Sequence, residues 1–240
     1  MSIPKKIHYC WFGGNPYPDD FKQYLESWKE NCPNYEYIEW NEKTFDIKCN
    51  KYVEEAYTSK KWAFVTDYVR LWAIYNFGGI YMDTDVEVLK PLDSFLLNEA
   101  FSGFERPNAV PTGIMAGRKG QVAIGDLLAD YDKRHFINSD GSLNLHTNVE
   151  YITDYFVTRG LQLNNTKQTI NGFTFYPREY FCPKNSRTLE LELTNNTYTI
   201  HHFAGSWTED KTKFRLKIKQ ALGPRLMKKV IEAMDKLKIK

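Results

Sequence analysis

Strand-like and helix-like patterns alternate along the first 135 residues of the chain. The run KIHYCWF at 6–12 predicts a buried strand that ends in a two-glycine turn, and residues 35–40 alternate as a second strand should. Between these strands, Phe21, Leu25 and Trp28 recur at helical spacing. The pattern therefore predicts a strand, a helix and a second strand at the start of the chain.

The next clear helix covers residues 63–76, and Phe77-Gly78-Gly79 ends it with an expected left-handed cap. A short strand at 80–82 follows, and a second resumes at 86–89. Further strands are expected at 100–104 and 198–202, and further helices at 122–133 and 149–159. This alternation predicts an α/β fold in which helices flank a mostly parallel central sheet. We expect one domain over residues 1–210.

The remaining residues, 211–240, differ from the rest in charge. They carry eleven Lys and Arg against Glu232 and Asp235, a net charge of +9, which leaves −7 for residues 1–210 because the chain totals +2. After Gly223-Pro224, apolar residues recur at helical spacing. A basic amphipathic helical extension is predicted, with two readings: it packs on the domain, or it attaches the protein peripherally to a membrane. The acidic body argues against nucleic-acid binding.

Overall composition is that of a globular protein, with 42% hydrophobic and 26% charged residues. The aromatic share of 15% is high and suits stacking on sugars or bases, although a well-filled core explains most single aromatics. The four cysteines lack the spacing of a zinc site. We find no apolar leader and no 20-residue apolar span, so the expected location is cytoplasmic. Peripheral contact with the inner face of the cell membrane is also considered.

Candidate chemistry begins at Asp83-Thr84-Asp85, directly after the strand at 80–82. Carboxylates at i and i+2 of an extended chain project to the same side and repel each other unless a cation lies between them. Oxygen ligands suit Mg²⁺ or Mn²⁺. A D-x-D alone is a weak motif, because most occurrences are solvated turns.

The preceding helix carries Asp67 and Arg70 at i and i+3, so they share one face. Two interpretations stay open from spacing alone. One is an ordinary ion pair within the helix, worth a few tenths of a kcal/mol. The other is a polar clamp for sugar hydroxyls beside the cation.

Three blocks of sequence together resemble glycosyltransferase family 32, the sugar-binding DXD group, which includes capsular polysaccharide transferases and is related to the catalytic domains of clostridial glucosylating toxins. The blocks are IPKKIH leading to WFGG at residues 3–14, WAFVTDYVRLWAIYNFGGIYMDTD at 62–85, and HHFAGSW at 201–207. The resemblance implies a GT-A type fold and a retaining, metal-dependent hexosyltransferase. The stretch 106–197 does not align.

The resemblance also implies site roles. Nucleotide-sugar contacts would come from Trp11, Phe12, Gly13, Asp67, Arg70, Tyr81, Asp83, Thr84, Ser206 and Trp207. The catalytic set would be Asp67, Arg70, Asp83 and Asp85, and the metal ligands Asp83, Asp85 and His202. His201 is the alternative third ligand, and His202 is preferred because it directly precedes Phe203-Ala204-Gly205.

The implied reaction moves a hexose from a nucleotide sugar, with UDP-galactose or UDP-glucose first, to a glycan or lipid-linked glycan acceptor in surface polysaccharide synthesis. The cofactor would be Mn²⁺ or Mg²⁺, acting as a Lewis acid on the leaving diphosphate. Two other classes compete with this reading: a metal-dependent phosphohydrolase, and an inactive glycan-binding domain.

Overall fold

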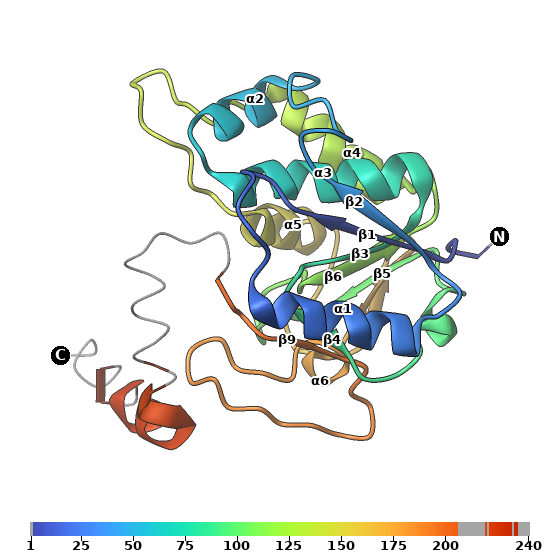
Figure 1. The fold of residues 1–240 in the computed structure, drawn as a ribbon, viewed down its shortest axis with the longest axis vertical. Helices are drawn as coiled ribbons and strands as arrows, with labels where there is room; N and C mark the ends of the chain where they lie inside the picture. Colours follow the sequence, from blue (N-terminus) through green and yellow to red (C-terminus); the bar gives the residue numbers. More distant parts are fainter. Residues whose placement is uncertain (1, 206–218, 220, 232, 235–240) are drawn as a thin grey trace.

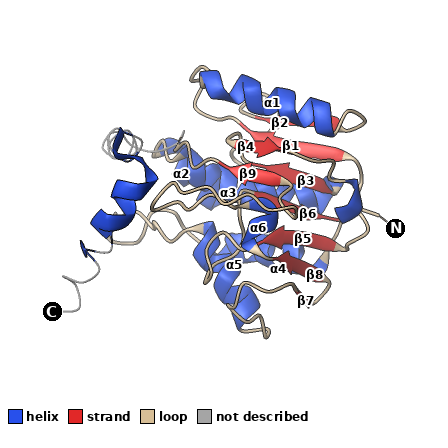
Figure 2. Cartoon of the chain, turned by 90° about the horizontal axis from the view of Figure 1, so that it is seen from below, coloured by secondary structure: helices blue, strands red, loops and turns tan. Residues whose placement is uncertain are grey.

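The computed structural model describes residues 2–205, 219, 221–231 and 233–234. Its largest unit is a seven-stranded sheet of order β2-β1-β3-β6-β5-β8-β7, and a two-stranded sheet pairs β4 with β9. Figure 2 shows the strands of the large sheet side by side in this order. The strands are β1 (Lys6–Cys10), β2 (Glu36–Trp40), β3 (Gly79–Met82), β4 (Val86–Val88), β5 (Ala100–Gly103), β6 (Ile114–Gly117), β7 (Gln168–Ile170), β8 (Phe173–Tyr176) and β9 (Thr199–His201).

Helices cover both faces of the large sheet, as Figure 1 shows. On one face lie α2, α3, α4 and α5, and on the other lie α1, α6 and the β4–β9 ribbon. The α-helices are α1 (Asp19–Asn31), α2 (Lys51–Thr58), α3 (Trp62–Phe77), α4 (Val122–Asp130), α5 (Asn148–Val157) and α6 (Arg178–Phe181). Two short 3₁₀ helices, η1 (Asp93–Phe95) and η2 (Tyr131–Lys133), complete the set.

The strand directions bear out the predicted mostly parallel sheet. β1 pairs in parallel with β2 and β3, and β5 pairs in parallel with β8, whereas β6 runs antiparallel to both β3 and β5. β1, β2, β3, β5 and β8 therefore share one direction, and β6 and β7 run against it. The carboxyl ends of the parallel strands consequently lie along one edge, which is where open α/β sheets bind ligands.

The core divides into two clusters, one for each face of the sheet. The larger includes Val65, Val69 and Ile74 of α3, and the smaller includes Trp28 of α1 together with Val86 of β4. α3 is apolar nearly all round because it lies against the sheet on one side and against α2 and α4 on the other. This burial fixes the helix that carries Asp67 and Arg70.

A glycine ends α3 as expected, but its ψ of 171° differs from that of the expected left-handed cap. Gly78 has φ of 65°, and its N–H donates to the Ile74 carbonyl at 2.8 Å. A Cβ at Gly78 would also lie 2.8 Å from the backbone nitrogen of Lys119, so no other residue fits. The turn reverses the chain directly into β3.

The segments expected from the hydrophobic pattern all occur, with shifts of one or two residues at most ends, except that the helix expected at 122–133 is α4 followed by η2. The elements not expected are α2, η1, β6, β7, β8 and α6. β6 is only four residues long, IMAG, yet it is wholly buried between β3 and β5. Strands this short carry too few positions to show a period.

Of the predicted extension at 211–240, residues 219, 221–231 and 233–234 are helical, and the others lie outside the described residues. Lys219 donates from Nζ to the Ser186 carbonyl at 3.2 Å. Within the described part of the chain, no helix is both long and apolar enough to cross a bilayer. The domain boundary near residue 210 stays a prediction.

Candidate active site

The acidic pair lies at the carboxyl edge of the sheet, where β3 gives way to β4. Asp83 follows β3 directly and Asp85 precedes β4 directly. The Asp83 N–H donates to the Gly113 carbonyl at 2.8 Å, and the Asp83 carbonyl accepts the Val86 N–H at 3.1 Å. The Tyr81 hydroxyl donates to Asp83 Oδ1 at 3.0 Å. Backbone and side-chain bonds thus hold the turn that presents both carboxylates.

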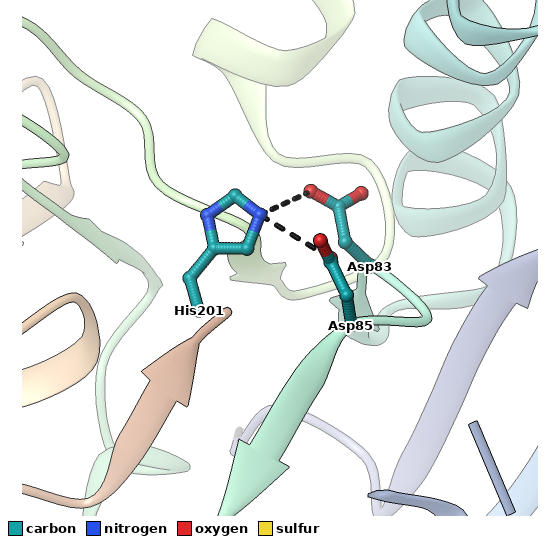
Figure 3. A group of neighbouring side chains, drawn as sticks. All are labelled: Asp83, Asp85 and His201. Atoms are coloured by element: carbon teal, nitrogen blue, oxygen red, sulfur yellow. Dashed lines mark ion pairs between the residues drawn. The ribbon is translucent and has the colours of Figure 1, made fainter. Parts of the chain in front are cut away.

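A histidine from a distant part of the chain joins this pair. β9 runs antiparallel to β4 and places His201 opposite Val86. His201 Nε2 lies 3.2 Å from Asp85 Oδ1 and 3.9 Å from Asp83 Oδ2. Figure 3 shows the imidazole facing both carboxylates. A ligand atom from each of the three side chains lies within 4.8 Å of the others.

Burial and charge make these groups depend on one another. Burial opposes ionisation of Asp85, but the neighbouring His201 outweighs burial and lowers the pKa of the carboxyl. Burial likewise opposes protonation of His201, but Asp85 raises its pKa well above the usual value. The charged forms of Asp85 and His201 thus favour each other.

A divalent cation fits the same three groups. Two carboxylate oxygens and one imidazole nitrogen form a donor set common for first-row divalent metals, and the three side chains offer one such atom each within 4.8 Å of the others. His201 Nδ1 is buried and has no hydrogen-bond partner among the described residues. Gly113 leaves room, because a Cβ there would lie 3.1 Å from Asp83 Oδ2 and from His201.

Asp67 and Arg70 form neither an isolated surface pair nor a separate site. Arg70 bridges Asp67 Oδ1 at 3.2 Å and Asp83 Oδ1 at 3.3 Å, and its guanidinium lies 4.7 Å from the Tyr81 ring centroid. The side chains of Asp67 and Arg70 are only 13% and 12% exposed, so surface screening does not apply. The contact between Arg70 and Asp83 therefore joins the Asp67–Arg70 pair to the acidic pair.

The pKa values of this row follow from burial. Burial raises the pKa of Asp67 to about 6, although Arg70 acts in the opposite direction. Burial alone would lower the pKa of Arg70, but Asp83, Tyr81 and Asp67 together raise it. Arg70 therefore stays charged, while Asp67 titrates near neutral pH.

The predicted third ligand, His202, lies elsewhere. Its Nε2 lies 2.8 Å from Glu87 Oε2, and its ring stacks on Tyr24 of α1 with centroids 4.7 Å apart. Successive side chains in a strand point to opposite faces, so His201 and His202 cannot both face Asp85. The structure therefore brings His201, the alternative that the sequence left open, and not the preferred His202, to the acidic pair, and the identity of the third ligand stays a prediction.

The predicted nucleobase residues lie at the carboxyl end of β1. Trp11 is 7% exposed, donates from its indole to the Asn15 carbonyl at 2.7 Å, and contacts the Tyr17 ring. Phe12 is fully buried, so only its backbone can reach a ligand. The stacking role of Trp11 stays a prediction.

Beside Gly13 lies a pocket of about 510 Å³ that sequence reasoning did not find. Its walls include Glu42, Tyr57 and Trp62. Glu42 Oε1 accepts the Gly13 N–H at 2.7 Å and the Tyr57 hydroxyl at 3.1 Å, and the Trp62 ring would lie 2.6 Å from a Cβ at Gly13. Only the GG dipeptide hinted at this close approach.

The other predicted contacts divide into two groups. Tyr81 and Thr84 are buried, at 1% and 6% exposure, so Tyr81 acts on the site through Asp83 and Arg70. Ser206 and Trp207 lie outside the described residues.

Comparisons with known proteins agree with this geometry. Residues 18–102 match a family model described as "Glycosyltransferase sugar-binding region containing DXD motif". This interval contains α3, Asp67, Arg70 and the acidic pair. Over this interval the chain is similar to the sugar-binding region of DXD glycosyltransferases.

A relative by sequence is inositol phosphoceramide mannosyltransferase 3 of Schizosaccharomyces pombe, 29% identical over 127 residues. The match covers 50% of this chain and 34% of that protein, so the chain spans about a third of its relative.

Two solved structures are similar in fold. PaToxG glycosyltransferase superposes with a TM-score of 0.50 at 19% identity over 65% of this chain and 69% of that one. A glycosyltransferase involved in glycosylation of the major capsid of PBCV-1 gives a TM-score of 0.49 at 12% identity, covering 89% and 98%. The PaToxG match agrees with the predicted α/β glycosyltransferase architecture.

Proposed function

We propose that this protein is a metal-dependent hexosyltransferase that takes its sugar from a nucleotide-sugar donor. The observation that carries the proposal is the convergence of Asp83, Asp85 and His201 at the carboxyl edge of the sheet, continuous with the buried Asp67–Arg70 pair. A solvated turn would leave the two carboxylates exposed and apart. The family model over residues 18–102 supports the same conclusion from sequence.

Each group has a distinct task in this proposal. Asp83, Asp85 and His201 hold the cation, which supplies Lewis-acid stabilisation of the charge that grows on the leaving diphosphate. The charged Arg70, fixed by two carboxylates, adds a preorganised donor beside it. Asp67 accepts a hydroxyl of the sugar and so positions the anomeric carbon.

The cation we propose is Mn²⁺ ahead of Mg²⁺. Mg²⁺ prefers oxygen ligands and keeps several waters, whereas imidazole is a common ligand of transition metals. His201 therefore shifts the preference of the site toward Mn²⁺.

The nucleotide moiety belongs at the end of β1. The pocket beside Gly13 lies next to Trp11 in sequence and has the volume of a small-molecule site. We assign UDP-galactose or UDP-glucose as first candidates. The name of the yeast relative keeps a mannosyl donor in the test.

The acceptor we propose is a glycan or lipid-linked glycan of surface polysaccharide synthesis. Retention of anomeric configuration, by front-face attack with the leaving phosphate assisting deprotonation, is part of the proposal. So are a cytoplasmic location and contact of residues 211–240 with the inner face of a membrane. Exposed Leu226, Val230 and Met234, spaced four residues apart, support that contact.

A thermal-shift screen tests the function directly. The full chain is heated with UDP, UDP-galactose, UDP-glucose and GDP-mannose, each with and without Mn²⁺, because stabilisation follows affinity for the native state. We expect an Mn²⁺-dependent rise in Tm with at least one nucleotide sugar, and transfer to an acceptor with an unchanged anomeric configuration by NMR. Phosphate release faster than transfer would instead indicate the phosphohydrolase, and no rise with any nucleotide would contradict the proposal.

A further inference from the structure

The pocket beside Gly13 has one carboxylate in its wall. Glu42 lies two residues after the end of β2, is exposed, and lines the pocket together with Gly13, Tyr57, Lys60 and Trp62. The pocket volume of about 510 Å³ is that of a small-molecule site. A ligand that fills this pocket therefore comes within reach of the Glu42 carboxylate.

Two hydrogen bonds fix the orientation of that carboxylate. The Gly13 N–H donates to Glu42 Oε1 at 2.7 Å, and the Tyr57 hydroxyl donates to the same oxygen at 3.1 Å. The other oxygen, Oε2, makes no hydrogen bond to any residue that the structure describes. Glu42 therefore offers the pocket one acceptor, Oε2, in a fixed position.

The other walls suit a flat ligand with polar edges. The rings of Tyr57 and Trp62 lie 4.9 Å apart between centroids, inclined at 65°, and both line the pocket. Lys60 adds an ammonium group, which is a donor only. Proteins recognise single nucleobases in this way, by contact with aromatic faces and by hydrogen bonds at the Watson–Crick edge.

A fixed acceptor beside a donor distinguishes two kinds of nucleobase. Uracil at N3 and guanine at N1 carry a ring N–H next to a carbonyl, so the N–H can donate to Oε2 and the carbonyl can accept from Lys60. Cytosine at N3 and adenine at N1 carry a lone pair instead, which a carboxylate oxygen repels. A site built to bond an N–H discriminates against a ligand that lacks it, because its own polar group is then left unpaired.

We propose that Glu42 recognises the ring N–H of the nucleobase, so that the donor is a uridine or guanosine diphosphate sugar and not a cytidine or adenosine one. This inference rests on the proposed function and on the place it gives to the nucleotide. Glu42 is a specificity residue in this scheme: it contacts the base and holds neither the cation nor the sugar.

Calorimetry on the full chain with Mn²⁺ tests the preference of wild type. The ligands are the plain nucleotides UDP, GDP, CDP and ADP, which share the diphosphate and differ in the base. We expect the tighter of UDP and GDP to bind at least about tenfold more tightly than either CDP or ADP, the effect of one hydrogen bond gained or lost.

Glu42→Gln tests the residue itself. Only the amide oxygen can accept the bonds from Gly13 and Tyr57, so the amide NH₂ group takes the place of Oε2 and turns an acceptor into a donor. The ratio of UDP to CDP affinity should fall at least about tenfold. The ratio is the readout because it cancels any general effect of the lost charge on diphosphate binding. Glu42→Ala, which should also lower the ratio, serves if the glutamine variant does not fold.

Glu54→Gln is the matched control. It makes the same chemical change on α2, where Glu54 pairs with Lys51 at 3.0 Å and does not line the pocket, so the affinity ratio should stay that of wild type.

Wild type that binds CDP or ADP as tightly as UDP and GDP would overturn the inference and leave the function intact, as would a Glu42 variant with an unchanged affinity ratio. Wild type that binds none of the four nucleotides in the presence of Mn²⁺ would overturn the proposed function and this inference together.

Discussion

Residue scale: the candidate site is a row of buried side chains in which acidic and basic groups alternate. From Asp67 through Arg70 and Asp83 to His201, each acidic group lies within 4 Å of a basic one. Burying a single charge would be costly, so each member depends on the next. The sequence predicted both the D-x-x-R and the D-x-D motif as candidate sites. It did not predict the direct contact between Arg70 and Asp83 that joins them.

The metal ligands can be separated from their neighbours by matched variants. Asp85→Asn and His201→Gln should abolish the Mn²⁺-dependent rise in Tm with UDP while the ligand-free protein stays folded, because each removes one ligand of three. Glu87→Gln and His202→Gln are the controls. Glu87 and His202 pair with each other away from the acidic pair, so both variants should keep the Mn²⁺-dependent rise in Tm. A lost response in His202→Gln with a retained response in His201→Gln would reverse the assignment.

The raised pKa of Asp67 predicts a pH dependence of stability. Between pH 3.8, the ordinary pKa, and about 6, the native state binds more protons at Asp67 than the unfolded state does, so stability falls as pH rises through this window and is flat above it. Asp67→Asn has no carboxyl group at this position and lacks this pH dependence. The free energy of unfolding of the variant, measured relative to that of wild type, should rise by on the order of 3 kcal/mol between pH 4 and pH 7.

Urea unfolding at several pH values measures this difference. A difference between wild type and Asp67→Asn that does not change with pH would contradict the raised pKa.

Element scale: the site needs the meeting of three segments that are distant in sequence. β3 and β4 present the acidic pair, β9 brings His201, and the turn before β6 supplies the Gly113 carbonyl that holds Asp83. β6 was not predicted: its four buried residues show no period, and no recognised motif marks it as the glycine turn and the acidic pair mark β3. The backbone of Gly113, directly before β6, holds the turn that presents Asp83 and Asp85.

Gly113 is the element-scale test. A Cβ there would lie 3.1 Å from Asp83 and from His201, so Gly113→Ala should push these ligands apart and reduce the Mn²⁺-dependent rise in Tm. A Cβ at Gly117, the last residue of β6, would lie 2.7 Å from Ile124 in the core. Gly117→Ala should therefore lower the ligand-free Tm more than Gly113→Ala does, and it should preserve the response to Mn²⁺. An undiminished Mn²⁺ response in Gly113→Ala would argue that the ion lies elsewhere.

Whole-molecule scale: the acidic body and basic C-terminal segment divide the charge of the protein. In a helix of 3.6 residues per turn, Leu226, Val230 and Met234 fall on one side, Lys228 falls on the opposite side, and Lys229 lies at the flank of the apolar side. That arrangement suits a helix lying at the surface of an anionic bilayer.

Vesicle sedimentation tests this contact. Replacing Arg225, Lys228 and Lys229 by Gln should release the protein from anionic vesicles, since each basic residue near such lipid contributes about 1 kcal/mol. Zwitterionic vesicles are the control and should bind both proteins weakly. Equal sedimentation of variant and wild type with anionic vesicles would exclude membrane binding through these three basic residues.

The amino-acid sequence by itself determined the alternation of elements, the helix that carries Asp67 and Arg70, and the acidic pair at the end of β3, because these depend on local periodicity and spacing. Tertiary structure alone decided that His201 rather than His202 meets the pair, because the pairing of β4 with β9 sets which side chain faces inward. It also decided that Arg70 joins the two motifs, because packing of α3 against β3 brings the Arg70 guanidinium to 3.3 Å from Asp83 Oδ1.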